Sequence, residues 1–181
     1  MQLKAESSKF KVFISCILWI VSCGLFFGGC VYVGPSILPS YIKKININTF
    51  ANESFRPDLD EKITSAVTRE FIADGRLITT GEDESDAILF GEIKRYALEP
   101  LSYTEKMNVE EYKVRIIINI WLKDLKQNKI LWREDNIESW AAASSTQGGL
   151  EIKVENEAIN EVVEKLARKV VKRVIDGWSN I

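Results

Sequence analysis

The most constraining feature of this sequence is the alternating segment from Tyr112 to Leu125. Large aliphatic residues occupy every second position of it, from Val114 through to Leu122. The other phase carries polar and charged groups at Lys113, Arg115, Asn119 and Lys123. A period of two is typical of a β-strand with one face on a hydrophobic core and the other largely in water. The chain must therefore form a sheet with a covering layer, and an all-helical fold is excluded.

Four further segments have the composition of strands. The predicted strands are Ile42–Phe50, Leu77–Thr80, Ala87–Leu98 and Lys129–Ser139. The turn at Lys126–Asn128 is so short that the strands on either side of it must be antiparallel. Leu98–Glu111 and Ala141–Lys153 are predicted loops, the second because it is rich in small residues.

Two amphipathic helices are predicted to cover the sheet. In the first, Asp58 and Glu61 have the spacing of a capping box, and Gly75 is suited to end the helix. Its apolar stripe consists of Leu59, Ile63, Ala66, Val67 and Phe71. The second helix spans Val154 to Ile175, with a stripe at Ile159, Val163, Leu166, Val170 and Val174. The predicted fold is α+β, a two-layer sandwich with two helices on one face of a mixed, mostly antiparallel sheet of four to five strands.

Composition excludes most kinds of catalytic and metal site. Histidine is absent from the 181 residues, and all three cysteines lie within the first 30. The folded domain therefore has no histidine-dependent catalysis, no disulfide framework and no zinc site built from these residues. The acidic segment Gly81–Asp86 lacks the spacing of an EF-hand loop. A net charge of −2 gives no general attraction to nucleic acid. We predict no catalytic residue, no metal and no cofactor.

The first 41 residues have the organisation of a bacterial lipoprotein leader followed by a tether. Three lysines precede an uncharged stretch with the apolar centre VFISCILWIV. Phe27-Gly28-Gly29-Cys30 resembles the apolar-small-small-Cys box in which the cysteine becomes lipidated. Cys23, after Ile20-Val21-Ser22, is an alternative lipidation site. A transmembrane helix is a further alternative, which Pro35 and the Gly28-Gly29 pair oppose.

This organisation predicts three segments. Residues 1–29 are a predicted signal peptide, residues 30–41 a tether lipidated at Cys30, and residues 42–181 a single folded domain. Val31 follows the cysteine where an Asp would resemble an inner-membrane retention signal, so sorting to the outer membrane is expected.

Several segments after the leader resemble the LPS-assembly lipoprotein LptE family. LPSYIKKI, INTFANESFRPDLDEKIT and REFIADGRL are similar to that family's first strand and first helix. ESDAILFGEIKRY and SYTEKMNVEEYKVRIIINIWLKD resemble its central hairpin, and AINEVVEKLARKVVKRVIDGW resembles its last helix. The likeness covers nearly all of residues 30–178, with Phe27 as a departure from the usual Leu of the lipobox.

The resemblance implies a lipid-anchored protein of the bacterial outer membrane. Such a protein plugs the LptD β-barrel, assists its assembly and contacts lipopolysaccharide during delivery to the outer leaflet, and no catalysis is implied. One alternative is a generic envelope lipoprotein with a structural or interaction role. Another is an enzyme acting on envelope lipid or glycan without histidine, which the lack of a convergent carboxylate or Ser–Lys constellation opposes.

The solvent-exposed face of the predicted sheet is the candidate partner-binding site. Apolar and aromatic groups interleave with charges there, a mixture that suits a protein interface. The candidate residues are Tyr96, Lys113, Arg115, Ile117 and Trp121. The alternative interpretation is the ordinary scatter of hydrophobic groups on a protein surface.

The two predicted loops provide the candidate lipopolysaccharide-binding site. In an antiparallel arrangement, Leu98–Glu111 and Ala141–Lys153 emerge at the same end of the sheet. Each carries a lysine, Lys106 and Lys153, and two ammonium groups at this end are suited to the phosphates of an anionic lipid. The alternative is that both are ordinary solvated lysines.

Overall fold

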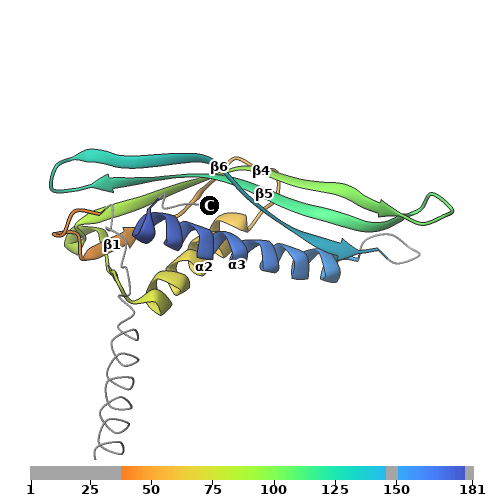
Figure 1. Cartoon of the computed structure of the whole chain (residues 1–181), viewed down its shortest axis with the longest axis horizontal. Coiled ribbons are helices and arrows are strands. Elements are labelled where there is room, and N and C mark those ends of the chain that lie inside the picture. Colours follow the sequence, from red (N-terminus) through yellow and green to blue (C-terminus); the bar gives the residue numbers. More distant parts are fainter. Residues whose placement is uncertain (1–37, 146–150, 178–181) are drawn as a thin grey trace, which may run out of the picture. The chain divides into compact units, whose positions relative to one another are not determined.

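The computed structural model describes residues 38–145 and 151–177, and it has two helices on one face of a mixed sheet (Figure 1). The long strands are β4 (Ala87–Tyr103), β5 (Val109–Asp124) and β6 (Lys129–Ser144), and the helices are α2 (Leu59–Asp74) and α3 (Ile152–Asp176). The short elements are β1 (Lys44–Ile47), β2 (Ala51–Asn52), β3 (Ile78–Thr79) and the 3₁₀ helix η2 (Glu82–Glu84). The predicted α+β class is confirmed, with six strands in the described sheet.

The sheet combines a parallel part with a larger antiparallel part. Its strand order is β3-β1-β4-β5-β6, and β2 pairs separately with β4. Strand β1 pairs in parallel with β3 and with β4, and β2 pairs in parallel with β4. Strands β4, β5 and β6 form an antiparallel meander. In this order β6 is an edge strand, and Figure 1 shows α3 running back along it.

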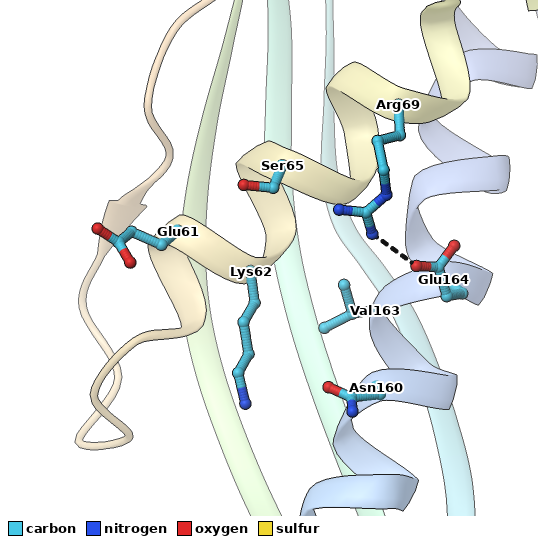
Figure 2. Close-up of a pocket in the computed structure, with 7 residues that line it drawn as sticks. All are labelled: Glu61, Lys62, Ser65, Arg69, Asn160, Val163 and Glu164. Carbon is cyan, nitrogen blue, oxygen red and sulfur yellow. Dashed lines mark hydrogen bonds and ion pairs between the residues drawn. The ribbon is translucent and has the colours of Figure 1, made fainter. Parts of the chain in front are cut away.

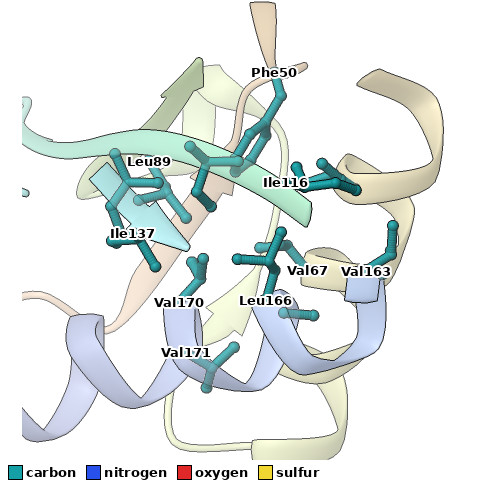
Figure 3. Close-up of a cluster of buried hydrophobic side chains, with 14 of the residues drawn as sticks. Phe50, Val67, Leu89, Ile116, Ile137, Val163, Leu166, Val170 and Val171 are labelled. Carbon is teal, nitrogen blue, oxygen red and sulfur yellow. The ribbon is translucent and has the colours of Figure 1, made fainter. Parts of the chain in front are cut away.

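Burial of the alternating residues explains this architecture. The five aliphatic residues from Val114 to Leu122 in β5 are fully buried, as the alternation predicts. They face the apolar stripes of α2 and α3, and Figure 3 shows Leu166, Val163 and Val170 of α3 within this cluster. Both predicted helical stripes are buried. The core therefore lies between the sheet and its single helical layer.

Gly91 of β4 makes room for one of the largest core side chains. Phe50 is buried, and a Cβ atom built on Gly91 would lie 2.1 Å from its Cε1. A larger residue at position 91 would therefore require the ring to move.

The two predicted loops are shorter than expected because the strands continue. Strand β4 reaches Tyr103 and β5 begins at Val109, so only a tight turn remains of the first loop. Strand β6 extends to Ser144 because Ala141 and Ala143 lie buried on the side facing the helices. Small residues thus allow α3 to approach the strand here. The rest of the second predicted loop lies partly outside the described residues.

The start of α2 differs from the predicted capping box. Asp58 has a φ of 64° and makes no side-chain cap hydrogen bond. An N-cap residue normally has an extended backbone, so that its side chain reaches the first free amides of the helix. The left-handed turn at Asp58 removes that geometry. At the other end, Gly75 has a φ of 71° and its amide donates to the carbonyl of Phe71 at 3.1 Å, as predicted.

A hydrogen-bonded clasp fixes the first described residues to the β5–β6 turn. The Tyr41 hydroxyl donates to the buried carboxylate of Asp124, and the Gln127 amide donates to the same hydroxyl at 2.8 Å. Burial raises the pKa of Asp124, but hydrogen bonds from Tyr41 and from backbone amides outweigh this effect and hold it below its usual range. The clasp holds this segment against the end of the sheet where β4 begins.

Candidate interaction surfaces

The sheet face opposite the helices carries four of the five predicted partner-binding residues. Lys113, Arg115, Ile117 and Trp121 alternate with the buried residues of β5, so they share this face, called the outer face below. Phe90 of β4 is paired with Trp121, and their rings stack at 5.6 Å between centroids. The outer face therefore carries a stacked aromatic pair. The sequence predicted Trp121 as a site residue but not Phe90.

Charged side chains from all three long strands contact one another or Trp121 across the rest of the outer face. Arg115 donates to Glu99 of β4 at 2.6 Å and lies 3.8 Å from Glu138 of β6. The guanidinium of Arg133 in β6 lies 5.0 Å from the ring centroid of Trp121. Cation–π contacts and bridging ion pairs of this kind hold side chains in fixed positions. The outer face is thus a structured polar and aromatic surface that neither of the two described helices covers.

Tyr96 does not belong to this face, contrary to the prediction. A β-bulge between Ile93 and Arg95 inserts one extra residue in β4, and Tyr96 pairs with the buried Ile116 as a result. The ring packs against the core, and its hydroxyl donates to Glu155 of α3 at 2.5 Å. Burial and this hydrogen bond raise the pKa of Tyr96. Tyr96 therefore connects the sheet to α3.

The end of the β4–β5 hairpin carries Lys106 in an exposed turn. The amide of Thr104 donates to the carbonyl of Asn108 at 2.8 Å and closes the turn. Within the turn, Met107 has a left-handed backbone with a φ of 61°. Several large apolar side chains are exposed near this turn, including Leu101, Tyr103 and Met107, the last 79% exposed. The turn Thr104–Asn108 together with these side chains is called the tip. It combines a cation with accessible apolar groups.

The second predicted lysine lies outside the tip, in the helix that follows β6. Ser144 of β6 pairs with Glu111, and the amide of Ser145 donates to the carbonyl of Glu110 at 2.8 Å. The end of β6 therefore lies beside the start of β5, as expected. Lys153 is in the first turn of α3, highly exposed and 4.0 Å from Glu157. Glu155 of α3 accepts a hydrogen bond from Tyr96, which lies seven residues before the end of β4, so Lys153 lies back along the sheet from the turn that carries Lys106.

A pocket of about 460 Å³ lies between the exposed sides of α2 and α3 (Figure 2). Arg69 and Glu164 form an ion pair of 2.8 Å across it. Figure 2 shows Glu61 at the opposite end of the pocket from Glu164. Among the described residues, no group of His, Cys, Asp or Glu side chains is arranged to hold a metal ion. The described helices include none that is both long and apolar enough to cross a membrane.

A second groove, of about 570 Å³, runs between the edge strand β6 and α3. Its helical side consists of four cations with helical spacing, Lys165, Arg168, Lys169 and Lys172. The sequence reasoning missed this cluster. The spacing of i, i+3, i+4 and i+7 places these residues on one face of a helix, so the signal was present in the sequence.

The solved structures with a similar fold are distant in sequence. A Xanthomonas campestris protein has a TM-score of 0.56 and 12% identity, with 77% of this chain and 90% of that chain covered. A putative lipoprotein from Caulobacter crescentus has a TM-score of 0.52 and 9% identity, with 74% and 89% covered. A minor lipoprotein from Acinetobacter baumannii has a TM-score of 0.50 and 14% identity, with 74% and 92% covered. At these identities the likeness establishes the fold alone.

The family assignment comes from the sequence itself. No curated relative matches this chain. The profile of the LptE family, described as lipopolysaccharide-assembly, matches residues 42–174, which span β1 to the last turn of α3. The match covers most of the chain and all of the described sheet. The chain therefore belongs to the LptE family of lipopolysaccharide-assembly proteins.

Proposed function

We propose that this chain is a lipid-anchored protein of the bacterial outer membrane that plugs and assists the assembly of an LptD-type β-barrel. The observation that carries the proposal is the outer face of an LptE-family domain, which no helix covers within residues 38–145 and 151–177. Two helices cover one side of the sheet, whereas the other presents Ile117 together with Arg115, paired with Glu99, and Trp121, in contact with Arg133. Aromatic and arginine side chains are enriched in protein interfaces. The lumen of a barrel offers a polar wall for such a surface.

The tip and the exposed first turn of α3, which carries Lys153, are the surfaces we assign to lipopolysaccharide. Lys106 and Lys153 supply ammonium groups for lipid phosphates, and the exposed apolar side chains of the tip suit the acyl chains of the same molecule. An amphiphilic ligand needs both kinds of contact. No catalytic step is part of this proposal.

Reversing the charges of Lys106 and Lys153 tests the lipid part of the proposal. In the full chain, Lys106→Asp with Lys153→Asp is expected to weaken lipopolysaccharide binding about tenfold, because two exposed attractive contacts become repulsive. Binding is measured with purified lipopolysaccharide and the detergent-extracted protein. Lys43→Asp with Lys129→Asp is the matched control, since these lysines lie at the opposite end of the sheet. Equal lipopolysaccharide binding by the Lys106→Asp/Lys153→Asp variant and the wild type would contradict the assignment.

A change on the outer face tests the barrel part. Ile117→Asp introduces a charge between Arg95 and Glu138, and we expect it to reduce co-isolation with the barrel several-fold while lipopolysaccharide binding is retained. The measurement is the amount of barrel recovered with the affinity-tagged lipoprotein from native membranes. The melting temperature is recorded in parallel, because Ile117 is partly buried. Recovery of the barrel at the wild-type level would argue against docking through this face.

A further inference from the structure

The groove between β6 and α3 has two rows of cations with different surroundings. Lys165 and Lys169 form the inner row, which contacts the sheet edge. Arg168 and Lys172 form the outer row, three residues further along the same helical face. Both members of the outer row are exposed. Among the described residues they have neither a hydrogen bond nor an ion pair, so their charges are uncompensated within that part of the chain.

The inner row shows that residues four apart on a helix have nearly the same spacing as residues two apart on a strand. The ammonium of Lys165 donates to the carbonyl of Trp140 at 3.1 Å, and that of Lys169 donates to the carbonyl of Glu138 at 2.6 Å. Four residues of helix rise about 6 Å, and two residues of strand rise about 6.6–6.8 Å. Lysines four residues apart on α3 therefore meet alternate residues of a neighbouring strand.

The same contacts prevent the edge of β6 from pairing with another strand there. The carbonyls of Glu138 and Trp140 face the free edge of the sheet, and the lysine ammonium groups occupy them. Lysines at an edge strand are a recognised protection against edge-to-edge pairing. A partner must therefore bind this groove through its side chains rather than through its backbone.

We propose that the outer row binds an extended protein segment with acidic residues at every second position. Arg168 and Lys172 repeat the spacing that Lys165 and Lys169 use on β6, so carboxylates on alternate residues of a strand lie at matching intervals. A barrel wall presents alternate side chains of each strand to its lumen. The inference rests on the proposed function in this respect, and it specifies the partner as a barrel strand with inward-facing acidic residues.

The arrangement favours a linear acidic segment over a compact phosphate. The four cations are distributed along seven residues of helix, a rise of about 10.5 Å, instead of converging on one point. Glu138 also lines the groove and would repel a dianion held deep in it. A strand lying along the outer row keeps its carboxylates at the exposed side of the helix, away from this residue.

Peptide binding to the full-length, detergent-extracted protein tests the inference. The probes are a synthetic peptide in which Glu and Thr alternate and a peptide of the same composition with its Glu residues in one block. The alternating peptide is expected to bind more tightly, and Arg168→Glu with Lys172→Glu is expected to weaken its binding about tenfold. The charge-conserving exchange Arg168→Lys with Lys172→Arg is expected to bind like the wild type. Lys43→Glu with Lys62→Glu changes the net charge equally at other sites and serves as the control.

The outcomes separate this inference from the proposed function. Equal affinity for the two peptides, or an unchanged affinity in the Arg168→Glu/Lys172→Glu variant, would overturn it. Displacement of the alternating peptide by inorganic phosphate or lipopolysaccharide at matched ionic strength would also overturn it, in favour of a phosphate site. Failure of any barrel to co-isolate with the wild-type protein would refute the proposed function, whereas peptide selectivity and its loss in the variant would still support the groove assignment.

Discussion

Replacing Leu166 with alanine is expected to lower the free energy of unfolding by about 2–5 kcal/mol. Leu166 is fully buried in α3, and Figure 3 shows it pointing into the cluster that includes Val67 of α2 and Ile116 of β5. The substitution removes apolar surface from the layer that joins both helices to the sheet, and the close packing of an interior leaves a cavity in its place. Urea unfolding followed by circular dichroism measures the change.

The matched control for this variant is Asn160→Ala on the exposed side of the same helix. Alanine has a high helix propensity, so this change is expected to leave stability within about 0.5 kcal/mol of the wild type. An unchanged unfolding midpoint for Leu166→Ala would show that α3 does not pack on the sheet through this stripe.

Replacing Cys30 with serine is expected to abolish both the lipid mass and the removal of residues 1–29 in nearly all of the protein. In our proposal the cysteine carries the lipid, and serine has no thiol to be acylated. The apolar leader then stays on the chain and keeps it at the membrane, so the mass rather than the fraction reports the loss of the lipid. Fractionation followed by intact-mass measurement tests both the anchor and the predicted removal of residues 1–29.

Cys23→Ser provides the control, because it removes the alternative lipidation site and leaves Cys30 in place. We expect this variant to remain in the membrane fraction with the wild-type mass. A reversed pattern, with the lipid mass lost in Cys23→Ser and kept in Cys30→Ser, would assign the lipid to Cys23 instead.

The fold was predictable where burial alone determines the residue pattern. The alternation in β5 and the two helical stripes identified the core, because one buried face leaves little freedom in register. The predicted end of β6 was wrong because small residues are typical of loops and also fit beneath a closely packed helix, as Ala141 and Ala143 do. The capping box at Asp58 failed because sequence spacing does not specify the sign of φ.

The interaction surfaces were less predictable than the core. Tyr96 was assigned to the outer face by counting alternate residues, and one bulge before it reversed the side on which its ring lies. The basic residues of α3 were visible as a helical stripe, but their significance depends on the adjacent strand being an edge. Strand order is a property of the whole topology, so helical spacing alone could not show it.

The length of the central strands gives the domain the property of a spacer. The Tyr41–Asp124 clasp holds the start of the domain at one end of β4, and the turn Thr104–Asn108 lies beyond the other end. The 17 residues of β4 span roughly 55 Å at the usual rise for a strand. The hydrocarbon core of a bilayer is about 30 Å thick. A molecule tethered through its first residues therefore has enough length to separate its anchored end from its opposite end by more than the thickness of that layer.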